Sequence, residues 1–81
     1  MPRFFFDTFD GEFSAQDDTG LELPDLEAAQ REAQAALSLM ARETLPAGNY
    51  RTFVMNVRDE TGKSVFRAAL SLVTSEGPFD D

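Results

Sequence analysis

The sequence contains no cysteine and no histidine among its 81 residues. Without cysteine there is no disulfide, and zinc sites built on cysteine or histidine are excluded. Nucleophilic triads and the usual general base near neutral pH are missing as well. The five glycines stand apart from one another, so no glycine-rich phosphate loop is present. We therefore expect that the protein is not an enzyme and holds no cofactor.

Positive charge and long apolar runs are also scarce. Seven basic residues against 15 acidic ones give a formal net charge of -8. Nucleic acid and anionic membrane surfaces are therefore poor partners, because both are bound through lysine and arginine. No apolar run approaches the ~20 residues of a membrane span, and the start of the chain lacks the apolar region of a signal peptide. These features predict a cytoplasmic location and leave a basic protein or a divalent cation as charge-matched partners.

The length of the chain fits one small domain, which buries only about 60% of its unfolded surface. We expect a single domain over residues 1–75 and an acidic, flexible tail over residues 76–81. Eight phenylalanines partly offset the small size, since each ring buries a large apolar area. Because disulfides and zinc are excluded, oligomerisation is the remaining common way to stabilise such a domain.

Turn and cap residues divide the chain into five elements. Asp10-Gly11 predicts a hairpin between strands at 3–10 and 12–16. Asp25 is a natural N-cap, and a helix is expected from there until Pro46-Ala47-Gly48-Asn49 turns the chain. Period-two alternation predicts two further strands at 50–59 and 63–74, joined by a turn that contains Gly62. The predicted fold class is α+β, with the order ββαββ.

We expect the helix to pack on one face of a four-stranded antiparallel sheet with the strand order 2-1-3-4. Its apolar stripe is predicted by spacings of three and four residues: Leu26, Ala29, Ala33, Leu37 and Met40. The sheet face beneath it is expected to carry Phe4, Phe6, Phe53, Met55, Val57, Phe66, Ala68, Leu70 and Leu72.

The opposite face of the predicted sheet has no element left to cover it. Exposed apolar patches of a few hundred Å² usually mark partner surfaces, so we expect two copies to pack through this face or through the strand edges beside it. A solvated face with scattered apolar residues is the alternative. The interface candidates are Phe5, Asp7, Phe9, Val54, Asn56, Arg58, Val65, Arg67, Ala69 and Val73. A secondary patch on the back of the helix comprises Ala28, Ala35 and Leu39.

Several carboxylates allow two interpretations of their role. Asp7 with Asp10, and Asp17 with Asp18, could bind a hard cation through oxygen, but turn roles explain these aspartates better, because the spacing of a calcium loop is absent. Asp7, Arg58 and Arg67 are expected to converge on the open sheet face. They would form either a cross-strand ion pair or a polar anchor inside an interface.

The chain resembles a family of short acidic proteins of alphaproteobacteria that is catalogued as a domain of unknown function. The residues that carry the resemblance are Met-Pro-Arg-Phe-Phe-Phe-Asp at 1–7, Asp10-Gly11, the segment from Asp18 to Ala29, and Val-Arg-Asp-Glu-Thr-Gly at 57–62 with Val65. The resemblance implies a stand-alone bacterial domain with this element order and no established activity.

Two functions remain open from the sequence. The first is a small interaction module that forms a homodimer through its sheet. The alternative is a regulatory or antitoxin-like domain that binds a basic protein partner or a small ligand.

Overall fold

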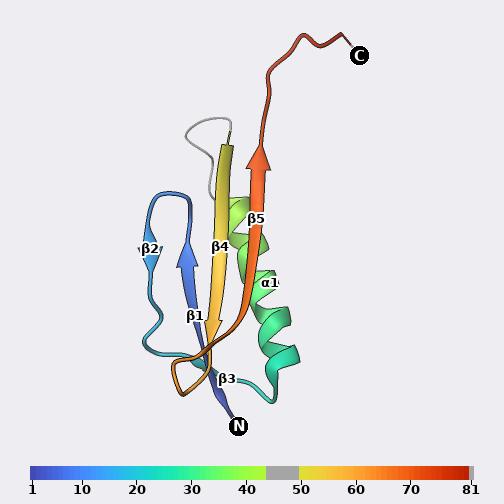
Figure 1. Ribbon diagram of the computed structural model, residues 1–81. Helices are drawn as coiled ribbons and strands as arrows, with labels where there is room; N and C mark the ends of the chain where they lie inside the picture. Colours follow the sequence, from blue (N-terminus) through green and yellow to red (C-terminus); the bar gives the residue numbers. More distant parts are fainter. Residues whose placement is uncertain (44–49, 81) are drawn as a thin grey trace.

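One helix packs against an antiparallel sheet in the computed structural model, which describes residues 1–43 and 50–80 (Figure 1). The predicted α+β class is thereby confirmed. The elements are β1 (Arg3–Phe9), β2 (Ser14–Ala15), β3 (Leu21–Glu22), α1 (Leu26–Glu43), β4 (Tyr50–Arg58) and β5 (Ser64–Val73). No helix in the described part of the chain is long and apolar enough to cross a membrane.

The sheet has five strands, where the sequence predicted four. Its main path runs β2-β1-β4-β5, and β3 pairs with β1 off this path. The predicted strands 3 and 4 correspond to β4 and β5, so the complete strand order differs from the predicted 2-1-3-4 by the additional strand β3. The additional strand arises because Leu21–Glu22 pairs with Arg3 and Phe4, beyond the point where β2 leaves β1. The sequence analysis assigned these two residues to no strand.

Aspartate side chains form both hairpin turns. The Asp10 carboxylate accepts hydrogen bonds from the backbone N–H groups of Glu12 and Phe13 at 2.9 and 2.7 Å. The Asp59 carboxylate accepts from the N–H groups of Thr61 and Lys63 at 2.9 and 3.1 Å. Such bonds replace ladder hydrogen bonds where the chain reverses. The two turns lie where the sequence predicted them.

Helix α1 begins at the predicted cap, since the Asp25 carboxylate accepts a hydrogen bond from the N–H group of Ala28 at 2.8 Å. The buried stripe consists of Ala29, Ala33 and Leu37. Met40 is half-buried, whereas Leu26, at the edge of the stripe, is 38% exposed. The predicted turn at residues 46–49 lies outside the described residues.

The core lies between α1 and the strands β4 and β5. Phe53 and Val57 are fully buried there beside Met55 and Phe4, and small alanines let the helix approach the rings closely. Leu70 and Leu72 lie on the helix side of the sheet, as predicted, but outside the buried core, because they remain 40% and 36% exposed. They lie on the edge strand, which only one neighbouring strand shields.

Candidate interaction surface on the open sheet face

The face of the sheet opposite α1 divides into two parts. Over β1 and the end of β4, polar side chains and the turn at residues 17–20 cover the strands. Over the middle of β4 and along β5, apolar and hydroxyl side chains lie bare. The sequence predicted that no element covers this face, and the first part corrects that prediction.

An ion pair between Asp7 and Arg58 anchors the covered part. The Arg58 Nε donates to Asp7 Oδ2 at 2.7 Å, and Nη2 donates to Oδ1 at 3.0 Å. The pair is about four-fifths buried, with exposed side-chain fractions of 20% and 22%. The Arg58 guanidinium also lies 5.1 Å from the centroid of the Phe5 ring. Hydrogen bonds from Arg58 hold the pKa of Asp7 below its ordinary value, and the pKa of Arg58 is raised in return.

Asp17 is the residue that sequence reasoning missed in this cluster. Its backbone carbonyl accepts a third hydrogen bond from Arg58 at 2.7 Å, and its N–H donates to Asp7 Oδ1 at 3.0 Å. Its carboxylate accepts from the N–H of Phe6 at 3.0 Å, in the stretch of β1 that neither β2 nor β3 reaches. The carboxylate thus replaces a strand partner at this edge.

The same carboxylate holds its own turn together. Asp17 Oδ1 accepts hydrogen bonds from the N–H groups of Thr19 and Gly20 at 3.0 and 3.1 Å. Desolvation raises the pKa of Asp17, but the N–H groups of Phe6, Gly20 and Thr19 outweigh it and leave the pKa below its ordinary value. The signal available in the sequence was the Asp-Asp-Thr-Gly turn, which did not reveal the distant partner.

Gly20 allows this turn to lie directly on the sheet. Its φ of 77° is in the left-handed region. A Cβ atom there would lie 2.8 Å from the Arg3 Cγ and 2.9 Å from the Phe5 Cε1. Phe5 is therefore half-buried beneath the turn and contributes less free surface than the sequence suggested.

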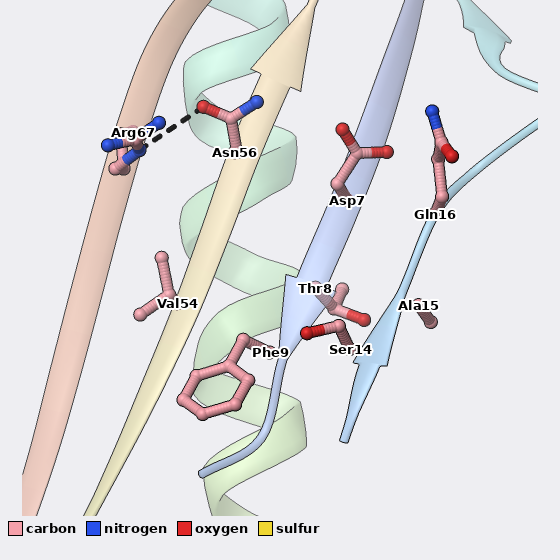
Figure 2. Close-up of a pocket in the computed structure, with 9 residues that line it drawn as sticks. All are labelled: Asp7, Thr8, Phe9, Ser14, Ala15, Gln16, Val54, Asn56 and Arg67. Atoms are coloured by element: carbon pink, nitrogen blue, oxygen red, sulfur yellow. Dashed lines mark hydrogen bonds between the residues drawn. The ribbon is translucent and has the colours of Figure 1, made fainter. Parts of the chain in front are cut away.

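Arg67 shares the open face with Asp7 and Arg58, as predicted, and lines the same groove as Asp7. It does not take part in the Asp7–Arg58 ion pair. The Arg67 Nε donates instead to Asn56 Oδ1 at 3.2 Å (Figure 2), and Asn56 donates onward to the Ser64 hydroxyl at 3.0 Å. Asp7, Asn56 and Arg67 pair in one row across the strands, whereas Arg58 pairs with Phe5 and Ser64, two residues further along β4.

Val65 also departs from the prediction. It packs against the core cluster on the helix side rather than on the open face. The cause is an irregularity in register: Val57 pairs with Phe66 and Arg58 with Ser64, so Val65 has no partner of its own. On the helix, Ala28 is half-buried, while Ala35 and Leu39 are exposed.

The bare part of the face retains four apolar residues of the predicted interface. Phe9 and Val73 are 37% and 64% exposed, Ala69 is exposed and Val54 is half-buried. A hydroxyl chain joins Tyr50, Thr52 and Ser71 nearby, with oxygen–oxygen distances of 2.8 and 3.0 Å. An open groove of about 490 Å³ lies between Phe9, Val54, Asn56, Arg67 and β2 (Figure 2).

The acidic residues form no metal cluster in the described ranges, where no group of three or more histidine, cysteine, aspartate or glutamate residues is placed to hold a metal ion. Asp7 and Asp17 bind protein groups, and Asp10 binds the backbone of its turn.

In its described residues, the protein is a small α+β domain whose helix covers one sheet face and leaves the other partly uncovered. The chain belongs to the family described as "Domain of unknown function (DUF6894)", which matches residues 3–71. The match includes the covered part of the open face, β5 as far as Ser71 and the Asp17 turn. Comparison with curated proteins and with solved structures gave no match.

Proposed function

We propose that this domain is a non-catalytic interaction module that self-associates by pairing the outer edge of β5 with β5 of a second copy. The observation that carries the proposal is the position of β5. It is the last strand of the sheet's main path, and no strand among residues 1–43 and 50–80 pairs with its outer edge. At ten residues it is the longest of the strands in the described residues.

β5 has few of the features that normally block edge pairing. Edge strands are usually short, or carry prolines, bulges or several charges. From Phe66 to Val73, β5 keeps a regular register with β4 and contains no proline and one charged residue, Arg67. Apolar side chains line both of its faces: Phe66, Ala68, Leu70 and Leu72 on the helix side, and Ala69 and Val73 on the open side.

The distribution of charge favours an antiparallel pair. Lys63 and Arg67 stand at or near the start of β5, whereas Glu76 and Asp80 follow its end. Antiparallel pairing of two copies brings the basic start of one strand beside the acidic end of the other. A parallel pair would bring like charges together, which destabilises neighbouring strands. The two-fold operation also places both helices on the same side of a continuous sheet.

A charge at the centre of β5 tests the proposal. The midpoint of the strand lies between Ala68 and Ala69, so Ala69→Lys would place two lysines near the two-fold axis. We expect the dissociation constant of the dimer, measured by sedimentation equilibrium, to rise about tenfold or more, as a like-charge cost of about 1.4 kcal/mol requires.

Ala35→Lys is the matched control, because Ala35 is an exposed alanine on the helix and the substitution changes the net charge equally. The control should associate like the original chain. An Ala69→Lys variant that associates as strongly as this control would contradict the proposal. A weakening by Ala35→Lys alone would assign the interface to the secondary helix patch instead.

The net charge of -8 supports a second candidate, a regulatory or antitoxin-like domain that binds a basic protein. The open groove beside Arg67 and Asn56 would suit a small ligand in the same class. Affinity capture at two salt concentrations separates the candidates. A stoichiometric basic partner that is lost as salt rises, together with a monomeric domain, would favour the second candidate.

A further inference from the structure

The segment after β5 carries a large apolar side chain away from the body of the protein. Residues 74–80 are exposed throughout and extend beyond the end of β5 (Figure 1). Phe79 is 63% exposed there. The radius of gyration is 15.1 Å, against about 12 Å for a fully compact chain of this length. The tail therefore holds an aromatic ring that lies beside Gly77 of its own segment and remains largely exposed.

A pocket of about 340 Å³ lies at the other end of β5. Its apolar lining comes from Pro2, Phe4, Leu26 and Val65, and Phe4 is only 6% exposed. Val65 belongs to this lining because the register irregularity at Val57 and Arg58 turns it away from the open face. The pocket thus combines an apolar floor with a wide mouth, as an aromatic side chain requires.

The rim of the pocket is charged. Arg3 provides a cation whose side chain is 38% exposed, although it already contacts Glu22 at 3.4 Å. Asp59 and Glu60 oppose an acidic ligand, but the Asp59 carboxylate accepts three hydrogen bonds within its own turn. Exposed ion pairs contribute little, so the ring, rather than the acidic residues around it, must supply most of any binding energy.

The tail cannot reach the pocket of its own copy. Val65 and Val73 are eight residues apart along β5, which corresponds to about 26 Å. The six residues from Val73 to Phe79 span at most about 22 Å when fully extended, and reversing direction shortens that reach. In an antiparallel β5 pair, by contrast, the tail of one copy runs toward the start of β5 in the other copy, where the pocket lies.

We propose that Phe79 of one copy binds in the pocket formed by Pro2, Phe4, Leu26 and Val65 of the second copy. This inference rests on the proposed pairing of β5. It identifies the side-chain contact that we expect at each end of the paired strands. It accounts for an exposed phenylalanine and an apolar pocket at opposite ends of one strand. The exchange is reciprocal, so a dimer contains two such contacts.

Substitution of Phe79 tests the contact. Phe79→Ser should raise the dissociation constant of the dimer at least about tenfold, since two rings lose their buried positions. Phe13→Ser is the matched control, because Phe13 is 68% exposed and lies at the β1–β2 turn, away from β5. Equal dissociation constants for the two variants would overturn the tail contact while leaving β5 pairing intact. An original chain that is monomeric at all concentrations would overturn the proposed function itself.

A synthetic peptide of residues 74–80 locates the contact directly. The full-length Ala69→Lys variant, labelled with ¹⁵N, is titrated with this peptide and with a peptide in which serine replaces Phe79. We expect saturable shifts of the amide signals of Arg3, Phe4 and Val65 with the first peptide alone. Shifts confined to other residues, equal shifts with both peptides, or no shifts would overturn the proposal.

Discussion

The two edges of the sheet differ in how far their backbone groups are paired within one copy. Along β1, the chain covers its own edge with β2, β3 and the Asp17 carboxylate, which bonds the one stretch between them. Along β5, the outer backbone edge of ten residues has no strand partner in the described residues. Apolar side chains lie on both faces of this strand. One edge is thus paired within the copy, whereas the other is the edge at which we propose that a second copy binds. Specific polar groups are concentrated at the closed edge, and apolar area is concentrated at the open one.

Removing Arg58 should break the closed edge most severely. Arg58→Ala leaves the Asp7 carboxylate and the Asp17 carbonyl without their charged donor. We expect the free energy of unfolding to fall by about 2–3 kcal/mol, measured by urea denaturation. Arg31→Ala removes an exposed helix pair with Glu27 and should cost less than about 0.5 kcal/mol. Equal losses in the two variants would show that the cluster does not anchor this edge.

A methyl group at Gly20 tests whether the Asp17 turn lies on Phe5. Gly20→Ala meets side-chain atoms of Arg3 and Phe5 within 3 Å, whereas Gly62→Ala, at a φ of 89°, meets no atom within 4 Å. Backbone strain alone should cost about 1 kcal/mol at Gly62, and the added overlap should bring Gly20→Ala to about 2 kcal/mol. Thermal unfolding of both variants measures the difference. No difference would mean that the turn does not contact the sheet closely.

Acid should weaken the Asp7 and Asp17 contacts of the closed edge. Hydrogen bonds lower the pKa values of Asp7 and Asp17 in the folded protein, so the unfolded chain binds protons more readily. Their stabilising contribution is therefore complete well above the unfolded value of about 3.9 and is lost as the pH falls through the folded values. Urea denaturation at successive pH values should show a steeper loss of stability below pH ~4 in the original chain than in Asp7→Asn. Parallel curves would contradict this assignment.

The sequence predicted the α+β class, the helix cap at Asp25 and both hairpin turns, because each depends on neighbouring residues. It could not predict that Asp17 would bind Arg58 and Phe6, since that contact joins residues far apart in the chain. The short strand β3 was missed because two residues show no periodicity. Val65 was misplaced because a one-residue irregularity reverses the face on which a side chain lies. Asp7 and Arg58 were paired correctly, because both lie on the same face of adjacent strands.

The open edge itself is tested most directly by amide hydrogen exchange, followed by NMR at low and high protein concentration. Pairing predicts that outward-facing amides along β5 exchange more slowly as concentration rises. The Phe6 amide, which already donates to Asp17 within one copy, should keep the same protection relative to the core throughout. Exchange along β5 that does not change with concentration would contradict self-association through this edge.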